Sequence, residues 1–459
     1  MCIRDRLNRA LQDSVEVIKL KAHELDIKER DAISQRDSLQ KVKNRVATAN
    51  KNLKAERDRA DANAQQSREA THEAVVARRE SEKQNALFRA LQLAERSMET
   101  PNDDTAAVRA LEAYQLFLDN DGDPYDPKIY AALELALESY QSNVRKYLHF
   151  SPYAMTYDVK NDKASMVSMR GELVRFFTDD NGPQIEVKSS MGSHGNRFVT
   201  ESPDGKWFLM SGENQRTLQV YDNRNCNLLY TLNGSDGDIL SAQAIPSKKI
   251  AVAGTITGRV LMWDLNQPNE PPLLLSEGDE EPFTCIALNP KGEMLAYAND
   301  LSVVGISGQG LSDTVIFQLS RGAVSSMVFD EKNTKLYVGF KGGEVGIIDI
   351  KSNRWIWREE VHKSKVTCMA LSPDGQFLAT GSLDNTLRLY RLDEFDEPPI
   401  IFRGHNGWVT GLAFSKDSKR IYSVAIDQTM REWYTDPETL AEDLGKRLNG
   451  KRDIMQQLR

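Results

Sequence analysis

The sequence predicts an all-β seven-bladed propeller preceded by a long α-helical coiled coil and a small helical connector, with α and β structure in separate domains. One pattern of three short apolar runs, separated by a polar turn and a short turn, recurs seven times between residues 155 and 434. The polar turns of successive copies lie 43, 43, 44, 41, 42 and 43 residues apart, a period typical of propeller blades. Residues 7–97 contain neither proline nor glycine, which favours one long helix.

Each repeat places a turn rich in Pro, Asp and Gly between its first two apolar runs, and Ser372-Pro373-Asp374-Gly375 is the clearest example. Fourth strands are expected at 228–232, 273–275, 315–319, 355–357 and 400–402. The last repeat runs instead into residues 436–438, which are typical of a helix start. We therefore expect residues 147–150, within a closing segment 144–150, to pair with the last repeat and close the ring.

These repeats resemble those of WD-repeat propeller proteins. In that family a His before the first strand, a Ser or Thr on the second, an Asp in the following turn and a Trp on the third form a hydrogen-bonded structural set. The resemblance assigns to the sixth repeat the set His362, Ser382, Asp384 and Tyr390, with Tyr in place of Trp. It assigns to the seventh His405, Asp427 and Trp433, with Ala425 where the hydroxyl is expected, and to the third Trp263 and Asp264, with Thr257 where the Asp belongs.

The long helix carries one apolar series with a strict interval of seven residues. Its members are Leu11, Ile18, Leu25, Ala32, Leu39, Val46, Leu53 and Ala60. This interval suggests a coiled coil, although the second seam is interrupted by Glu29, Arg36, Lys43 and Asn50. The helix is therefore expected to mediate self-association or to act as a spacer. Its basic and acidic residues are interleaved and no aromatic residue precedes Phe88, so we predict no nucleic-acid partner.

Residues 86–143 are expected to form the helical connector and residues 436–459 a C-terminal helix, on either side of a propeller at 144–435; residues 1–85 form the long helix. The connector sequences at 110–114, 123–127 and 129–133 resemble the segment that joins a coiled coil to a WD-repeat propeller in bacterial signalling ATPases of the STAND class. That resemblance implies a sensor arm that restrains an ATPase. The chain itself has no Gly-x-x-x-x-Gly-Lys-Ser/Thr phosphate loop.

The first six residues, Met1 to Arg6, resemble translated adaptor sequence and lead directly into a helix. We therefore expect an N-terminally truncated fragment, and the alternative is a naturally short protein.

The sequence predicts no catalytic residue, cofactor or metal. His362 and His405 belong to the structural set, and no Ser or Cys lies in a nucleophile elbow. The acidic stretch 119–126 lacks the spacing of a calcium loop and is expected to be a turn between helices. A propeller hydrolase or lyase is the alternative from another class.

The predicted function is a non-catalytic scaffold that docks a protein partner. Loops entering the innermost strands gather on one face of a propeller, and the candidate partner-binding residues in these loops are Asp279, Glu280, Glu281, Arg403 and Trp408. The alternative for Trp408 is packing over the inner strand, and the alternative for the acidic loop is a solvated surface. The net charge is −8 and the apolar runs are short, so no membrane span is predicted in this chain. We expect a cytoplasmic protein, or one tethered to a membrane through a preceding anchor.

Overall fold

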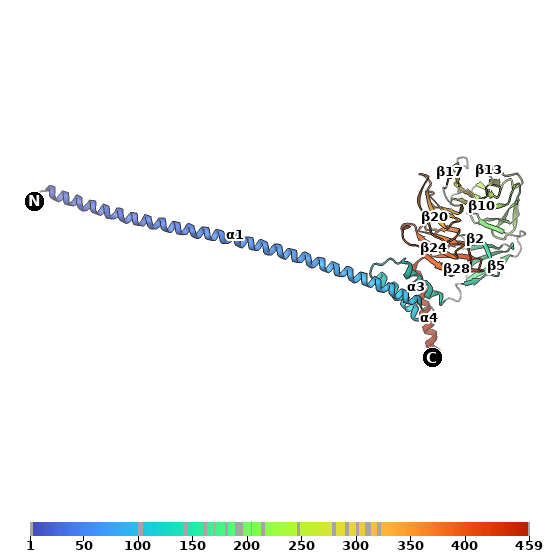
Figure 1. The fold of residues 1–459 in the computed structure, drawn as a ribbon, viewed down its shortest axis with the longest axis horizontal. Helices are drawn as coiled ribbons and strands as arrows, with labels where there is room; N and C mark the ends of the chain where they lie inside the picture. Colours follow the sequence, from blue (N-terminus) through green and yellow to red (C-terminus); the bar gives the residue numbers. More distant parts are fainter. Residues whose placement is uncertain are drawn as a thin grey trace. The chain divides into compact units, whose positions relative to one another are not determined.

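The computed structural model describes residues 3–99, 104–140, 145–158, 163–168, 170–179, 182–188, 196–202, 204–212, 216–245, 248–277, 281–289, 293–299, 303–307, 314–318 and 323–457. The chain divides into two compact units, Met1–Asn85 and Ala86–Arg459. Figure 1 traces both units along the chain.

Helix α1 (Ile3–Glu99) is continuous, as expected where neither Pro nor Gly interrupts the backbone. In the first unit its described side chains are almost all exposed, including the apolar residues Leu11, Leu25, Leu39 and Leu53 of the seven-residue series. Among the described helices, none combines the length and the apolar character that a membrane span needs.

Within the described part of the second unit, the strands form seven four-stranded antiparallel sheets, numbered here in chain order. Sheet 1 contains β2 (Pro152–Asp158), β3 (Lys163–Ser168), β4 (Leu173–Asp179) and β5 (Gly182–Lys188), and sheet 2 contains β6 (Asn196–Glu201), β7 (Trp207–Gly212), β8 (Leu218–Asp222) and β9 (Leu228–Leu232). Sheet 3 contains β10 (Ile239–Ile245), β11 (Ile250–Thr255), β12 (Arg259–Asp264) and β13 (Leu273–Glu277), and sheet 4 contains β14 (Phe283–Leu288), β15 (Leu295–Asn299), β16 (Val303–Ser307) and β17 (Thr314–Gln318). Sheet 5 contains β18 (Val324–Phe329), β19 (Lys335–Phe340), β20 (Glu344–Asp349) and β21 (Arg354–Glu360), and sheet 6 contains β22 (Val366–Leu371), β23 (Phe377–Ser382), β24 (Thr386–Arg391) and β25 (Ile400–Arg403).

Six of these sheets are built from four consecutive strands, whereas sheet 7 is composite. It contains β26 (Val409–Phe414), β27 (Arg420–Ala425), β28 (Thr429–Tyr434) and, from the other end of the unit, β1 (Arg145–Tyr147). Strand β1 pairs antiparallel with β28, with Arg145 opposite Arg431 and Tyr147 opposite Thr429. Strand β1 lies inside the expected closing segment 144–150, and Leu148 and Phe150, which follow it, are buried in the hydrophobic cluster shared by sheets 7 and 1.

The turn between the first two strands of a repeat is held by a side-chain oxygen at the residue that follows the first strand. In sheet 6 the hydroxyl of Ser372 accepts the backbone N–H groups of Gln376 (3.1 Å) and Phe377 (2.9 Å). Asn289 does the same for residues 293 and 294 through its amide oxygen. Gly375 of the sheet 6 turn has φ +69°, which explains the glycine at that position. The recurring polar turn therefore has a local physical cause.

Neighbouring sheets are joined by a recurring hydroxyl bond. All seven described innermost strands have a register shift at their second residue, and in four of them the hydroxyl there donates to the first carbonyl of the next innermost strand. These bonds run from Thr284 to Val324 (2.9 Å), from Ser325 to Val366 (2.6 Å), from Thr367 to Val409 (2.5 Å) and from Thr410 to Pro152 (2.8 Å). The last bond joins sheet 7 to sheet 1.

Each pair of successive sheets also shares a hydrophobic cluster of described residues, and so do sheets 7 and 1. Burial of these apolar surfaces is the main force that holds the sheets side by side. The result is a propeller-like fold, visible as the group of β-strands in Figure 1.

The connector helices and the C-terminal helix pack on sheets 6 and 7. These helices are α2 (Asp104–Leu118), α3 (Pro127–Glu138) and α4 (Pro437–Gln457). They share one hydrophobic core with Phe402 and Trp433 of the sheets. The ring of Tyr130 meets that of Phe402 edge-on at 5.9 Å, and the Tyr130 hydroxyl donates to the carbonyl of Tyr434. Segments at the two ends of the second unit thus form one packed body with the sheets.

Candidate functional site

The polar network of sheet 7 runs from a strand to the turn at its end. The Trp433 indole Nε1 donates to Ser423 Oγ (2.7 Å), and Ser423 Oγ lies 2.8 Å from His405 Nε2. Indole can only donate, so the serine proton is free for His405 Nε2 in the neutral imidazole. His405 Nδ1 then donates to Asp427 Oδ2 (3.2 Å). The four side chains form one directional chain of hydrogen bonds from the sheet interior to its edge.

Sheet 6 repeats this chain without its aromatic end. His362 Nδ1 lies 3.0 Å from Asp384 Oδ2, and His362 Nε2 lies 2.8 Å from Thr380 Oγ1. Tyr390, which stands where sheet 7 has Trp433, stacks on Phe395 with ring centroids 4.8 Å apart. The network of sheet 6 therefore contains His362, Asp384 and Thr380, and Thr386 also donates to Asp384 (2.6 Å).

Both aspartates are held ionised by their hydrogen-bond donors. Burial alone raises the pKa of Asp384 and of Asp427. The bonds that they accept from His362 and Thr386, and from His405 and Thr429, outweigh burial and hold each pKa far below its usual range. The carboxylates also accept the backbone N–H groups of Lys363 (3.0 Å) and Asn406 (2.7 Å), which fixes the loops that carry the histidines.

The hydroxyl of this set was misplaced by two residues in the sequence analysis. Ser382 was assigned to it, but its hydroxyl donates to the carbonyl of Ser364, and Thr380 contacts His362 instead. Ala425 was taken to leave sheet 7 without a hydroxyl, yet Ser423 supplies it. Side chains two residues apart share a face of a strand, so both positions fitted the pattern, and only the reach of the imidazole distinguishes them.

Sheet 3 keeps the tryptophan but uses a different polar arrangement. Trp263 is 1% exposed, and its indole donates to the carbonyl of Asn233 (2.9 Å). Asp264 accepts the backbone N–H of Asn266 in the next turn. Thr257, in the place of the Asp, donates to Asp236 (2.9 Å) in the loop before the first strand. In sheet 3 the carboxylate therefore lies in the loop before the first strand, and the hydroxyl that it accepts lies in the turn after the second strand.

The predicted partner face is best defined around Trp408. Its side chain is 52% exposed, in contrast to Trp263, and its carbonyl is held by the N–H of Ile426 (3.0 Å). A Cβ on Gly407 would come within 2.8 Å of the Asp427 backbone nitrogen, so the loop closes tightly on the turn below. Trp408 therefore projects from a loop that the sheet 7 network immobilises.

The other described residues of the predicted face belong to sheet 6 and to the loop before sheet 4. Arg403 ends β25 and is exposed, and Glu281, just before β14, is partly exposed; Asp279 and Glu280 lie outside the described residues. The structure adds Tyr153, 42% exposed at the bulge of β2, next to the carbonyl that accepts the Thr410 hydroxyl. Sequence analysis had no signal for Tyr153, because its exposure depends on how sheet 1 meets sheet 7.

The described residues contain no group of three or more His, Cys, Asp or Glu side chains that could hold a metal ion.

Comparison with known protein families identifies two of the repeats. Residues 356–391 and 396–434 match the family model described as "WD domain, G-beta repeat". These segments contain most of sheet 6 and sheet 7, the two sheets with His–Asp pairs. The chain therefore contains WD40 repeats.

Individual relatives match longer segments of the chain. The chain is 31% identical to Periodic tryptophan protein 2 of Arabidopsis thaliana over 26% of the chain and 13% of that protein. It is 28% identical to Actin-interacting protein 1-2 of Arabidopsis thaliana over 34% of the chain and 26% of that protein. It is 22% identical to the Target of rapamycin complex subunit wat1 of Schizosaccharomyces pombe over 52% of the chain and 77% of that protein. The matches thus span about a quarter or less of the first two relatives.

Proposed function

We propose that this chain is a non-catalytic scaffold whose seven sheets form the blades of one closed ring and whose Trp408 face docks a protein partner. The observation that carries the proposal is the exposed indole of Trp408 on a loop fixed by the His405–Asp427 pair. Rigid aromatic side chains lose little conformational entropy on binding and dominate many protein interfaces. The names of two relatives, one interacting with actin and one a subunit of a complex, agree with an interaction role.

The test compares Trp408→Ala with Ile356→Ala in retention of proteins from a cell extract on the immobilised chain. Ile356 is also 52% exposed but lies on the outermost strand of sheet 5. We expect at least one protein to be retained by the wild type and by Ile356→Ala and lost with Trp408→Ala. Equal retention by all three would contradict the proposal.

We further propose that the long helix pairs with a second copy. The exposed series Leu11, Leu25, Leu39 and Leu53 supplies one apolar seam. Sedimentation velocity of the full chain checks this: Leu25→Gln with Leu39→Gln should shift the chain toward monomer, whereas Val75→Gln with Val76→Gln, also exposed but outside the series, should not.

A second candidate function rests on the connector sequence, which resembles the segment before the propeller of STAND-class ATPases. In this reading the propeller restrains an ATPase module of a longer protein, and binding of a partner on the Trp408 face releases it. The connector and sheets 6 and 7 share one hydrophobic core, so a movement of the propeller would move the connector with it. If the gene encodes that module, its ATPase activity should rise when the propeller is deleted; unchanged activity would contradict the restraint.

A further inference from the structure

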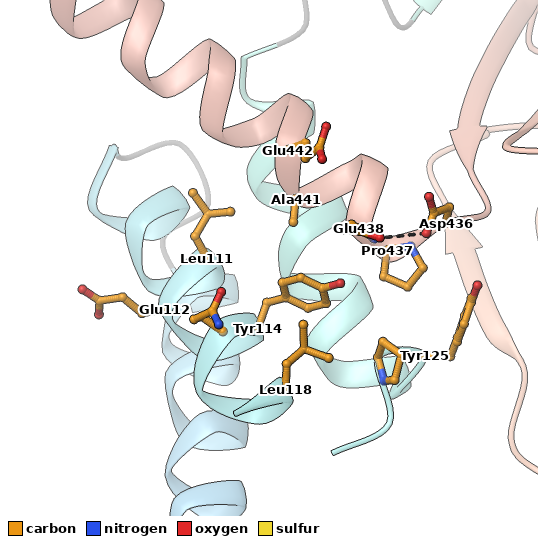
Figure 2. Close-up of a pocket in the computed structure, with 12 residues that line it drawn as sticks. Leu111, Glu112, Tyr114, Leu118, Tyr125, Asp436, Pro437, Glu438, Ala441 and Glu442 are labelled. Atoms are coloured by element: carbon orange, nitrogen blue, oxygen red, sulfur yellow. Dashed lines mark hydrogen bonds between the residues drawn. The ribbon is translucent and has the colours of Figure 1, made fainter. Parts of the chain in front are cut away.

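A groove of about 800 Å³ lies between α2, the loop that follows it and the first turns of α4. The described residues that line it are Leu111, Glu112, Tyr114, Gln115, Leu118, Pro124, Tyr125, Asp436, Pro437, Glu438, Ala441 and Glu442. Figure 2 shows the ring of Tyr114 above Leu118, with Tyr125 to the right and Glu438 and Ala441 on α4. Residues more than 300 positions apart in the sequence thus form one concave surface.

The walls of this groove are fixed before any ligand arrives. Asp436 caps α4 by accepting the N–H of Glu438 (3.3 Å) and the hydroxyl of Thr439 (2.5 Å). Tyr434, just before the cap, donates its hydroxyl to Asp443 (2.7 Å). On the other side, a Cβ on Gly122 would collide with the ring of Phe117, so the chain turns closely under α2. A preformed groove binds at a low entropic cost.

The lining combines apolar surface with negative charge. Leucine, proline, alanine and tyrosine side chains cover most of it, four carboxylates stand along it, and none of its described lining residues is basic. Burial, followed by the charges of Glu438 and Asp436, raises the pKa of Tyr114 to about 12, so its hydroxyl remains a neutral donor. Lys419 lies 3.6 Å from Asp436 and Lys446 lies 3.2 Å from Glu442, but both lysine side chains are exposed, so these pairs neutralise the groove only weakly.

We propose that this groove docks a segment of a partner protein that carries an apolar side chain with Lys or Arg beside it. The apolar side chain would fill the space against Tyr114, Leu111 and Leu118, and the cation would lie against Glu438 and Glu442. Charge complementarity selects this occupant, because an acidic segment would bring like charges together. The guanidinium of Arg391 lies 4.9 Å from the ring centre of Tyr125, so an aromatic side chain of this groove already holds a cation over its face. The groove is lined by the connector and α4, not by the Trp408 loop, so this proposal does not depend on the first.

The experiment selects phage-displayed random dodecapeptides on the immobilised full chain and measures binding of the enriched peptides by fluorescence anisotropy at about 150 mM salt. The groove variant is Glu438→Gln with Glu442→Gln. The matched control is Glu270→Gln with Glu331→Gln, which makes the same charge change at exposed residues of other sheets. Leu111→Ala tests the apolar contact separately.

We expect the enriched peptides to pair an apolar residue with Lys or Arg, and the groove variant to weaken their binding at least tenfold while the control changes it less than twofold. Leu111→Ala should weaken binding about fivefold, which simple charge attraction would not produce. Trp408→Ala should leave the peptide affinity unchanged, so a failure of the Trp408 proposal is distinguishable. Equal losses from the two double variants, or enrichment of peptides without basic residues, would overturn the proposal. Concentration-dependent self-association that the groove variant abolishes would instead assign the groove to a second copy.

Discussion

Sheets 6 and 7 differ from sheets 1 and 2 in how the same four-stranded architecture holds its polar groups. In sheet 7, Asp427 accepts bonds from His405, from the N–H of Asn406 and from Thr429 at both its N–H and its hydroxyl. Between sheets 1 and 2 the buried guanidinium of Arg175 donates to the carbonyl and the side-chain oxygen of Asn223, both at 2.6 Å. Two unrelated polar sets therefore serve one fold.

The second set leaves a carboxylate incompletely satisfied. Asn223 donates to Glu201 Oε1 (2.6 Å), whereas the buried Oε2 has no hydrogen-bond partner among the residues that the structure describes. Burial, and then the charge of Asp158, raises the pKa of Glu201 to about 7, although Asn223 and Arg175 oppose the shift. The pKa values of Asp384 and Asp427 are lowered instead, because several hydrogen-bond donors surround each of these carboxylates. Propeller geometry thus does not determine the electrostatics inside it.

The largest expected effect comes from removing the aromatic end of the sheet 7 network. Trp433→Ala deletes a buried side chain that packs against Phe402 and donates to Ser423, and we expect a loss of about 4 kcal/mol in the free energy of unfolding. Tyr390→Ala removes only packing from the matching place in sheet 6 and should cost less, about 3 kcal/mol. Urea unfolding followed by tryptophan fluorescence measures both, since all six tryptophans lie in the second unit. Equal losses would mean that the hydrogen-bond chain adds nothing to the packing.

Prediction from the sequence succeeded where the physics is local and periodic. The period of about 43 residues and the polar turns predicted the repeats, because a side-chain oxygen such as that of Ser372 closes each turn within a few residues. The long helix followed from the absence of Pro and Gly.

Features formed by distant segments could not be predicted in the same way. The groove depends on the packing of α4 against α2, and the exposure of Tyr153 depends on where β2 meets sheet 7. The buried Arg175 with Glu201 carries no family pattern at all, and its charges would have suggested surface positions. The error over Ser382 and Ala425 had a different origin, since alternate residues of a strand are equivalent by pattern.

The second prediction uses the opposite pKa shifts of the two regions. A carboxyl group with a raised pKa in the folded state binds a proton more tightly there, so the stability it supports is lost as pH rises from about 4.5 to about 7. Glu201→Gln stays neutral, so it should match the wild type near pH 4.5 and be more stable by up to about 3 kcal/mol at pH 8. Urea unfolding at a series of pH values measures the difference. A constant difference across this range would show that Glu201 does not titrate in the folded protein.

Asp427→Asn should show the reverse dependence. The lowered pKa of this carboxyl means that its contribution is present above the ordinary Asp range and is lost as pH falls through the folded-state value. We expect the variant to be about 2 kcal/mol less stable than the wild type at pH 7, and the gap to narrow below pH 4. Asp384→Asn is the matched variant in sheet 6 and should behave alike. A gap that widens on acidification would contradict the description of both aspartates as ionised acceptors of hydrogen bonds.

The smallest expected effect on stability concerns the hydroxyl bonds that join neighbouring sheets. Thr410→Val removes the hydroxyl that joins sheet 7 to Pro152 of sheet 1 while keeping the β-branched shape, and we expect a loss of about 1 kcal/mol in the free energy of unfolding. Thr410→Ser keeps the donor and is the control, and Thr284→Val removes the equivalent bond between sheets 4 and 5. If ring closure between sheets 7 and 1 is cooperative with the other contacts, both valine variants should lose similar amounts, because every junction must break for the propeller to unfold. A loss at Thr284 without one at Thr410 would mean that the junction of sheets 7 and 1 opens before the rest, and that the first and last strands are the weak point of the ring.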